Sequence, residues 1–503
     1  MLGGKLMDKR LRCDELKNRV MSAQEAAKLF EDDMVVGTSG FTPAGYPKAV
    51  PLALADRVKN GEDIGITLIT GASVGPELDG ALSESGVIKR RYPYQTNSSC
   101  RNSINNSEIN YSDMHLSHTP QWVKYGFFGK IDIALVEAVA ITEEGYIIPS
   151  TSIGNSNVFI ECADKVIIEI NTSQPIELEG IHDVYNVEVP PNRKPIPLVK
   201  ANDKIGTPYI MCNKDKIAAI VYTDIKDKTR PVAPIDSVSE KMAKNLIGFL
   251  EKEVEANRLP KNLLPLQSGV GSVANAILGG LVESEFEDLV VYSEVIQDSV
   301  IDLIERGKVK FASGTSLTIS PERLDNFYMN FSKYKDKLIL RPQEISNSPE
   351  VARRLGVIAI NTAIEVDIYG NVNSTNIMGS RMMNGIGGSG DFARNGYLTI
   401  FTTESIAKNG NISSIVPMVS HHDHTEHDVM VIVTEQGVAD LRGLSPKERA
   451  EEIIKNCAHP NYKDALYDYF NRACDGKYKH TPHILEESLS WHEKFLNDGS
   501  MIK

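Results

Sequence analysis

Leu289-Val-Val-Tyr-Ser-Glu-Val-Ile-Gln-Asp-Ser-Val300 is the stretch of sequence that decides the fold. Its first residues, Leu289–Tyr292, form an apolar run rich in β-formers that follows an acidic cluster, which predicts a buried parallel strand. Glu294 comes just after the end of this predicted strand. Because ligands bind at the carboxyl ends of strands in open α/β sheets, Glu294 is a candidate reactive group. A helix-capping acid or a ribose-binding acid fits the same position equally well.

Strand-like runs alternate with helical patterns and glycine-rich loops along the rest of the chain. This alternation predicts an α/β fold of the open, doubly wound kind. A helix is predicted over residues 47–59, and the polar stretch 94–111, rich in Asn and Ser, is predicted to be a loop. The other predicted strands are residues 34–37, 64–70, 131–136, 309–312, 337–340, 357–361, 398–402, 415–419 and 429–433.

The chain also contains an internal repeat. Residues 133–156 resemble residues 358–380, with Ala138 and Gly145 aligned to Ala363 and Gly370 at a constant offset. Each copy has the pattern of a strand, a turn at a glycine and a return strand. The repeat predicts two similar open α/β domains, residues 1–230 and 231–503. Chance similarity between two β-rich stretches is the alternative.

Composition narrows the class of protein. At 503 residues, the chain is too long for a single core, and 41% apolar with 24% charged residues is typical of a soluble globular protein. A net charge of −13 argues against a general nucleic-acid binder. No apolar run approaches the roughly 18 residues of a membrane span, and no signal peptide is evident, so we expect a cytoplasmic protein. The six cysteines form no C-x-x-C pair, which argues against a disulfide framework and a zinc site.

Two glycine-rich loops are candidate ligand sites. Gly269-Val-Gly-Ser-Val-Ala274 fits G-x-G-x-x-A after a predicted strand, and Glu294 follows at the distance of a ribose-binding acid, so this unit also fits a nicotinamide dinucleotide site. The second loop, Gly385–Gly390, has no clear strand before it. Such loops supply backbone N–H groups to any oxyanion or phosphate.

The histidine-rich run His421-His-Asp-His-Thr-Glu-His427 could be a metal site or a hydrogen-bonded polar corner. His421 and His422 are adjacent and would point to opposite faces of an extended segment, which favours the polar corner. Glu435 follows the next predicted strand and is either a helix cap or a site residue.

Several of these motifs together resemble the acetyl-CoA hydrolase/transferase family, and most closely its class I succinyl-CoA:acetate CoA-transferases. The resemblance covers nearly the whole chain. The motifs that carry it are Gly40-Phe-Thr-Pro-Ala-Gly-Tyr-Pro47, Ser268-Gly-Val-Gly-Ser-Val-Ala-Asn275, Tyr292-Ser-Glu-Val-Ile-Gln-Asp298, Gly385-Ile-Gly-Gly-Ser-Gly-Asp-Phe-Ala-Arg-Asn395, Val416-Pro-Met-Val-Ser-His-His-Asp-His-Thr-Glu-His-Asp428 and Thr434-Glu-Gln-Gly-Val-Ala-Asp-Leu-Arg442.

The resemblance implies two α/β domains of CoA-transferase type and assigns roles to residues. It implies Glu294 as the catalytic nucleophile and the backbone N–H groups of Val270 and Gly388 as oxyanion donors. A substrate or auxiliary role is implied for Asn347 and Glu435, whereas Arg230 is only a near match to the family's auxiliary arginine. The residues implied in coenzyme A binding are Gly269, Val270, Gly271, Ser272, Val273, Asn384, Gly388 and Lys408.

The implied activity moves coenzyme A between an acyl-CoA and a small carboxylate through a glutamyl-CoA thioester with ping-pong kinetics. Succinyl-CoA and acetate are the expected pair, coenzyme A enters as substrate, and no metal or permanent cofactor is expected. A homodimer is expected on family grounds. An acetyl-CoA hydrolase, a nicotinamide-dependent oxidoreductase built on the Gly269–Glu294 unit and a non-catalytic CoA-binding regulator are the alternatives.

Overall fold

A sheet of eight strands organises the amino-terminal part of the computed structural model, which describes residues 9–232 and 234–502. The order is β4-β3-β2-β1-β5-β7-β8, and β6 pairs with β5. All pairs are parallel except β5–β6, as an α/β fold requires. The strands are β1 (Val35–Thr38), β2 (Ile66–Ile69), β3 (Ile88–Tyr92), β4 (Asn110–Tyr111), β5 (Ile131–Ile141), β6 (Ile147–Pro149), β7 (Ala163–Asn171) and β8 (Ile217–Thr223).

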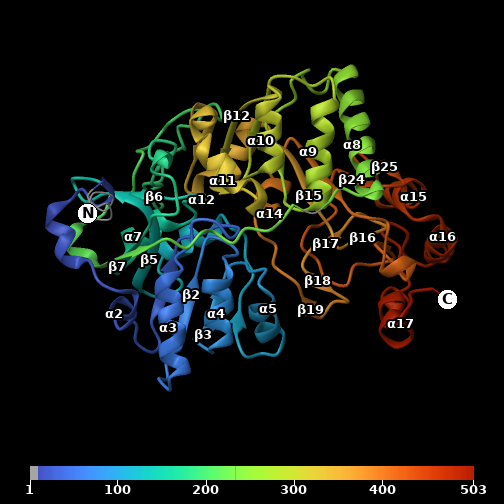
Figure 1. Cartoon of the computed structure of the whole chain (residues 1–503). Helices are drawn as coiled ribbons and strands as arrows, with labels where there is room; N and C mark the ends of the chain where they lie inside the picture. The colour runs from blue at the N-terminus through green and yellow to red at the C-terminus, as the bar shows by residue number, and fades with distance from the viewer. Residues whose placement is uncertain (1–8, 233, 503) are drawn as a thin grey trace. The chain divides into compact units, whose positions relative to one another are not determined.

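Helices cover both faces of this sheet. On one face, Val36 and Leu135 share a core with Val50 and Leu54 of α3. On the other face, the ring of Phe159 in α7 lies so close to Gly37 that a Cβ there would be 2.4 Å from it. Figure 1 shows α2, α3, α4 and α5 beside the strands. The helices are α2 (Ala23–Ala27), α3 (Ala49–Lys59), α4 (Ala81–Glu84), α5 (Ser98–Asn105), α6 (His118–Lys124) and α7 (Ser156–Cys162).

The chain divides into two compact units. The first contains the described residues up to Pro231 together with Val291–Ile304 and Lys310–Val351, and the second contains the rest. This grouping places Glu294 in the first unit. The division into sequence domains 1–230 and 231–503 remains a prediction.

The inserted segments bring further short elements into the first unit. Strand β11 pairs in parallel with β13, and β12 pairs in parallel with β14. Loops of the first sheet reach both pairs, since Ser152 bridges to Ser316 and His182 to Leu340. The elements of these segments are β10 (Leu289–Tyr292), β11 (Val295–Gln297), α10 (Asp298–Glu305), β12 (Val309–Gly314), β13 (Ser316–Thr318), α11 (Pro321–Met329), β14 (Leu338–Leu340), α12 (Gln343–Ser346) and α13 (Pro349–Leu355).

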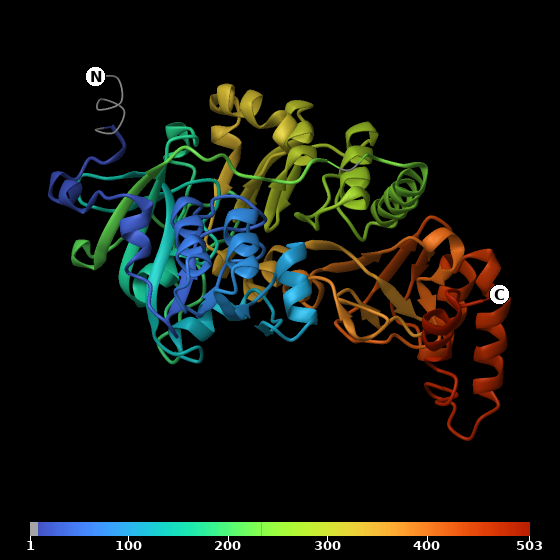
Figure 2. The same cartoon turned by 60° about the horizontal axis from the view of Figure 1, so that its bottom comes forward.

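The second sheet has eight strands in the order β14-β12-β10-β9-β15-β20-β24-β25, of which β9, β15, β20, β24 and β25 belong to the second unit. The β9–β15, β15–β20 and β20–β24 pairs are parallel, and β24–β25 is antiparallel. Helices α15 and α16 (red in Figure 2) contribute Ile453 and Leu466 to the core of this unit. Its elements are α8 (Ser237–Glu255), β9 (Leu266–Ser268), α9 (Ser272–Glu283), β15 (Ile358–Thr362), β16 (Glu365–Asp367), β17 (Val372–Asn373), β18 (Asn376–Ile377), β19 (Arg381–Met382), α14 (Ser389–Ala393), β20 (Leu398–Thr402), β21 (Ile406–Ala407), β22 (Ile412–Ser413), β23 (Ile415–Val416), β24 (Val431–Thr434), β25 (Gly437–Asp440), α15 (Pro446–Cys457), α16 (Pro460–Cys474) and α17 (Ser490–Asp498).

The internal repeat corresponds to similar local structure in the two units. In the first, β5 turns at Gly145, with φ +88°, and pairs antiparallel with β6. In the second, β16 turns at Gly370, with φ +90°, and pairs antiparallel with β17.

The predicted strands are present, but the predicted loop 94–111 is wrong, because it contains α5 and β4. Among the described residues, no helix is both long and apolar enough to cross a membrane.

Candidate active site

Glu294 lies in the two-residue link between β10 and β11. Its carbonyl oxygen accepts hydrogen bonds from the backbone N–H groups of Thr315, at 2.7 Å, and Ser316, at 3.2 Å. The adjacent Val295 is in register with Ser316 in the β11–β13 pair. These contacts fix the backbone on the carboxyl-terminal side of the Glu294 Cα, and Ser293 N–H, which donates to the Ser313 carbonyl at 3.0 Å, fixes the other side. Together they limit where the Glu294 carboxyl can point.

Asn347 is the side chain that contacts the Glu294 carboxyl. It is fully buried at the end of α12, and its Nδ2 donates to Glu294 Oε1 at 2.5 Å. The hydroxyl of Ser346 donates to Asn347 Oδ1 at 3.1 Å, which orients the amide so that its nitrogen faces Glu294. The structure thus brings together two of the residues predicted for the site.

The pKa of the Glu294 carboxyl is raised to about 7, because burial disfavours its charged form more than the hydrogen bond from Asn347 favours it. A carboxylate that has lost most of its hydration is more basic and more nucleophilic than one in water. A strongly perturbed acid with a designated amide partner is a pattern found at functional sites.

Strand β13, which holds Glu294, is itself held by the loop that follows β6. Leu317 N–H donates to the Thr151 carbonyl at 2.8 Å, and Ile153 N–H donates to the Thr315 carbonyl at 3.0 Å. The Thr151 hydroxyl in turn donates to Asp227 at 2.7 Å. This loop therefore connects the Glu294 backbone to a buried cluster of charges around Lys48.

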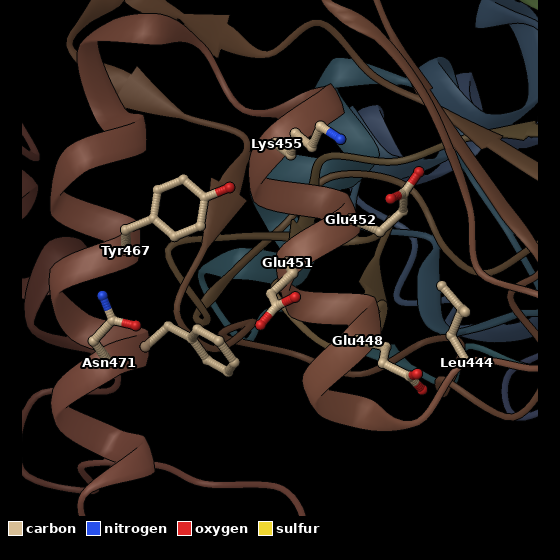
Figure 3. Close-up of a pocket in the computed structure, with 8 residues that line it drawn as sticks. Leu444, Glu448, Glu451, Glu452, Lys455, Tyr467 and Asn471 are labelled. Carbon is tan, nitrogen blue, oxygen red and sulfur yellow. The ribbon is translucent and has the colours of Figure 1, made fainter.

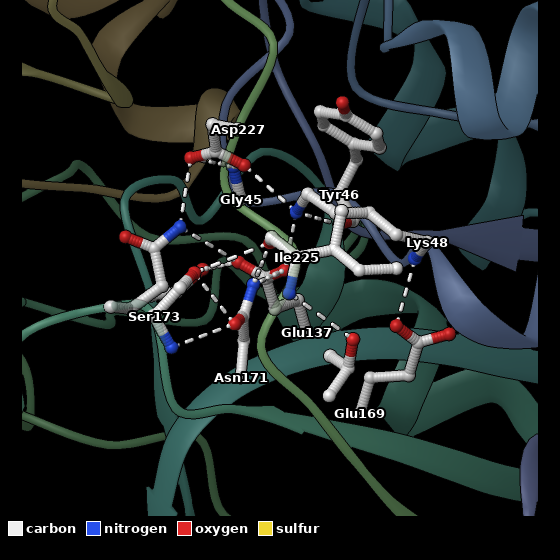
Figure 4. A network of polar contacts seen from close by, with 12 residues as sticks. Gly45, Tyr46, Lys48, Glu137, Glu169, Asn171, Ser173, Ile225 and Asp227 are labelled. Carbon is white, nitrogen blue, oxygen red and sulfur yellow. Dashed lines mark hydrogen bonds and ion pairs between the residues drawn. The ribbon is translucent and has the colours of Figure 1, made fainter.

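The Lys48 cluster lies inside the first unit (Figure 4). The ammonium of Lys48 contacts Glu137 at 2.5 Å and Asp227 at 2.8 Å, and all three side chains are buried. Burial acts against the ammonium, but these two carboxylates raise the pKa of Lys48. Asp227 also accepts from the N–H of Gly45, so the cluster fixes the Gly40–Pro47 loop. Sequence reasoning missed this cluster, because a lysine after a proline carries no signal of burial.

The first glycine loop follows β9 and begins α9. Gly269 N–H donates to the Ile360 carbonyl at 3.1 Å, and Gly271, with φ +120°, is the N-cap of α9. Val270 between them is 48% exposed although it is aliphatic. Ser272 and Val273 form the first turn of the helix, whose N–H groups have no partner within the helix. The loop can thus offer backbone donors to an anionic group.

The second glycine loop lies at the same edge of the second sheet. Gly388 is the N-cap of α14, and Asn384 upstream accepts from the N–H of Gly385 at 2.8 Å. Helix α14 ends beside the amino end of β15, where Tyr397 donates to Val357. Both α9 and α14 therefore begin toward the carboxyl ends of the parallel strands, the edge where open α/β sheets bind ligands.

The remaining predicted residues lie beyond β20 and β24. Lys408 is exposed in the turn between β21 and β22, where its backbone φ is +51°. Glu435 follows β24 and accepts from the N–H of Ser405 at 2.9 Å, from the Ser405 hydroxyl and from Gln436 Nε2 at 2.9 Å. Burial alone would raise the pKa of Glu435, but these donors outweigh it and lower the pKa.

The histidine-rich run is a polar corner. Asp423 accepts hydrogen bonds from the backbone of Ser374, at 2.6 Å, and from the Thr375 hydroxyl, at 2.9 Å, while His424 is buried. Nowhere in residues 9–232 and 234–502 do three His, Cys, Asp or Glu side chains form a group that could hold a metal ion. The contacts of Asp423 are those of a hydrogen-bonded polar corner.

A pocket of about 380 Å³ lies between α15 and α16 (Figure 3). None of its lining residues is among those predicted for the site. Two of its glutamates have structural partners, since Glu448 caps α15 with Ser445 and Glu452 accepts from Asn456. The lining residues are Leu444, Glu448, Glu451, Glu452, Lys455, Tyr467, Phe470 and Asn471.

Comparison with known proteins accounts for both halves of the chain. Residues 4–222 match the acetyl-CoA hydrolase/transferase N-terminal domain, and residues 324–470 match the corresponding C-terminal domain. The chain is 61% identical to the succinyl-CoA:acetate CoA-transferase of Clostridium kluyveri, over 98% of this chain and 92% of that protein. It is 44% identical to the acetyl-CoA hydrolase of Schizosaccharomyces pombe, over 99% of this chain and 98% of that protein.

The fold has a counterpart among solved structures. The crystal structure of a 4-hydroxybutyrate CoA-transferase from Porphyromonas gingivalis superimposes with a TM-score of 0.64 at 22% identity, covering 91% of this chain and 99% of that one. This likeness confirms the predicted α/β fold of CoA-transferase type. Because the two domain matches together cover more than half of the chain and a relative at 61% identity covers 98% of it, this chain belongs to the acetyl-CoA hydrolase/transferase family.

Proposed function

We propose that the protein transfers coenzyme A between an acyl-CoA and a small carboxylate, with succinyl-CoA and acetate as the expected pair, through a covalent thioester on Glu294. The observation that carries the proposal is the Glu294 carboxyl, which is desolvated, has a pKa of about 7 and is held by Asn347. The family and the 61% identity to a succinyl-CoA:acetate CoA-transferase support the substrate class.

In the proposed reaction, the Glu294 carboxylate attacks the thioester carbonyl of the acyl-CoA. The C–S bond breaks, which leaves an acyl-glutamyl anhydride and the CoA thiolate. The thiolate then attacks the glutamyl carbonyl, and the C–O bond breaks, which releases the first carboxylate and leaves glutamyl-CoA. A second carboxylate repeats these steps in reverse, so no net proton is consumed and the kinetics are ping-pong.

The tetrahedral species formed at each attack carry an oxyanion, and a carboxylate is a weak nucleophile, so the barrier depends on hydrogen-bond donors. We assign this role to the backbone N–H groups of Val270 and Gly388. Binding of coenzyme A is assigned to Gly269–Val273, Asn384, Gly388 and Lys408, and an auxiliary role in carboxylate binding to Asn347 and Glu435. Exposure of Val270 and the backbone donors at the start of α9 support these assignments.

Hydrolysis of acyl-CoA is the second candidate function, because the chain is 44% identical to an acetyl-CoA hydrolase over nearly its full length. Water would attack the same glutamyl thioester in place of a carboxylate. The two functions share Glu294 and differ in what discharges the intermediate.

Intact mass analysis with peptide mapping, after mixing the protein with succinyl-CoA or acetyl-CoA and no acceptor, tests the proposal. A CoA adduct on the peptide that contains Glu294, discharged by acetate or succinate, is the expected result. The absence of an adduct with steady release of free CoA would favour the hydrolase. The absence of both would contradict the covalent mechanism.

The resemblance also suggests a homodimer with no permanently bound cofactor, and the composition suggests a cytoplasmic location. We propose these properties as expectations for the purified protein. Light scattering in solution would test the dimer, and denaturing release followed by mass analysis would detect a bound cofactor.

A further inference from the structure

His424 is a buried residue of the histidine-rich run that the proposed reaction leaves without a role. It is 3% exposed, and its Nε2 lies 3.0 Å from the hydroxyl oxygen of Ser389. Ser389 directly follows Gly388, the proposed oxyanion donor. The imidazole therefore contacts the second glycine loop one residue from the N–H group on which the reaction is proposed to depend.

The direction of this hydrogen bond follows from the other contact of Ser389. Its hydroxyl also lies 2.7 Å from the Ile386 carbonyl, which can only accept. The single hydroxyl hydrogen of Ser389 is used there, so the hydroxyl oxygen must accept from His424 Nε2–H. The imidazole is thus a donor toward the loop.

The bond to Ile386 closes the turn that contains Gly388. Gly387 has φ +60° and Gly388 has φ −93° and ψ 1°, the φ signs of a type II′ turn with glycine at its first central position. The backbone bond of this turn, from Ser389 N–H to the Ile386 carbonyl, is long at 3.4 Å. The Ser389 hydroxyl supplies the shorter bond, so the side chain of Ser389 contributes to fixing the peptide plane of Gly388.

His424 is itself held rigidly. Its backbone N–H and carbonyl pair with Val372, at 3.1 Å and 2.8 Å, and its ring packs on Phe401 of β20 with centroids 4.7 Å apart. Phe401 is fully buried. The core of the second unit therefore fixes the imidazole, and its hydrogen bond to Ser389 restrains the glycine loop.

We propose that His424 is a positioning residue, which donates to Ser389 and so fixes the N–H of Gly388 in the direction that oxyanion stabilisation needs. The inference rests on the proposed function, since it gives Gly388 a role in catalysis. His424 acts through Ser389 and is not itself a catalytic residue.

The test compares steady-state transfer by the full-length variants Ser389→Ala, His424→Ala and His424→Gln. Losing an oxyanion donor altogether lowers kcat by on the order of 10²–10³, so a donor that is present but loosely held should lower kcat about tenfold in Ser389→Ala and His424→Ala, with KM for acyl-CoA within about twofold. His424→Gln retains an N–H donor at the end of a side chain of similar reach, and it should restore kcat to within about threefold of the parent. The Ser389→Ala/His424→Ala double variant should lose no more than Ser389→Ala alone, because Ser389→Ala already removes the contact with His424.

His427→Ala is the matched control, because His427 is an exposed histidine of the same run and contacts only Thr425 among the hydrogen bonds described for it. It should keep the parental kcat. A parental kcat in Ser389→Ala, a loss confined to KM, or a His424→Gln variant that is as slow as His424→Ala would each overturn the inference. If His424→Ala does not fold, Ser389→Ala and His424→Gln carry the same test.

Glu294→Ala, assayed in parallel, separates this inference from the proposed function. Transfer by a folded Glu294→Ala protein would overturn the proposed function. An inactive Glu294→Ala protein together with a fully active Ser389→Ala protein would overturn only the role of His424.

Discussion

Glu294 and Glu435 have the same sequence signature, a carboxylate just past a buried strand, yet their surroundings differ. Glu294 accepts from Asn347, and burial raises its pKa to about 7. Glu435 is also partly buried, but it accepts from the backbone and hydroxyl of Ser405 and from Gln436, and its pKa is lowered. Both carboxylates follow a buried strand, but burial outweighs the single donor at Glu294 and raises its pKa, whereas the donors at Glu435 outweigh burial and lower its pKa.

The difference separates a reactive carboxylate from an anchoring one. A carboxylate with few donors keeps lone pairs available for attack, and its desolvation makes the attack more favourable. A carboxylate with several donors is stabilised in its charged form and holds its neighbours in place. On this basis we propose Glu294 as the nucleophile, whereas Glu435 fixes the chain after β20 by accepting from Ser405, beside the auxiliary role proposed for it.

Replacing each glutamate by glutamine is the strongest way to break the comparison. Glu294→Gln should lower transfer by on the order of 10⁴-fold or more, because the nucleophile is lost. Glu435→Gln should lower it only about tenfold, the effect of about 1.4 kcal/mol of lost positioning. Steady-state assays on both proteins, with folding checked by circular dichroism, measure the difference. Equal losses in the two variants would remove the distinction drawn here.

The same pair should differ in the sign of their effect on stability. A carboxyl whose folded pKa is about 7, above the ordinary 4.5, destabilises the fold by about 3 kcal/mol once it is charged in both states. That destabilisation is absent below pH 4.5, develops between pH 4.5 and 7 and is complete above pH 7. Glu294→Gln should therefore melt at a higher temperature than the parent at pH 8, with no such gain near pH 4.5. Glu435→Gln should instead melt lower at pH 8, and a gain there would contradict the assignment.

Much of the difference between the surroundings of Glu294 and Glu435 could not be predicted from the sequence. The apolar run Leu289–Tyr292 predicted β10 correctly, because burial on both faces leaves an apolar pattern in the sequence. Placement of Glu294 just past the strand followed from the same pattern. The contact with Asn347 did not follow from it, because 53 residues separate the partners and only tertiary packing brings α12 to Glu294.

Local polar sequence was also misleading in the segment 94–111. Its Asn and Ser residues predicted a loop, since such side chains compete with helical hydrogen bonds. In the structure, Asn97 instead caps α5 by accepting from the N–H of Cys100, and Cys100 is buried against the first core. Ile104 of α5 packs on the same core, and neither the cap nor these two apolar positions are distinctive in sequence.

Removing the Asn347 amide should widen the difference between Glu294 and Glu435, because Glu294 then loses its hydrogen-bond donor. The hydrogen bond from Asn347 lowers the pKa of Glu294, so Asn347→Ala should raise that pKa further above 7. Transfer at pH 7 should fall about tenfold, since less carboxylate is present and its orientation is lost, and part of the loss should return at pH 9. A pH profile of kcat measures the displaced acid limb. An acid limb that does not shift would contradict the role of Asn347. The control is Asn330→Ala, which alters the amide of the residue after α11 that donates to Asn326.

Removing one hydrogen-bond donor from Glu435 should shift its pKa upward, in the direction of the raised pKa of Glu294. Ser405→Ala deletes the hydroxyl that donates to Glu435, so the lowered pKa of Glu435 should move back toward its ordinary value. Because a carboxyl with a lowered folded pKa stabilises the fold above its unfolded pKa, this variant should lose about 1 kcal/mol or less at pH 7. The loss should fade as the pH falls below the ordinary pKa of a glutamate and through the lowered folded pKa of Glu435, because both proteins then carry a protonated Glu435. Urea unfolding midpoints at the two pH values measure it, and Ser490→Ala, whose hydroxyl donates to a backbone carbonyl, should show the same change at both. A Ser405→Ala effect independent of pH would mean that Ser405 stabilises the loop by packing alone, and Glu435 would then lose its role as an anchoring carboxylate.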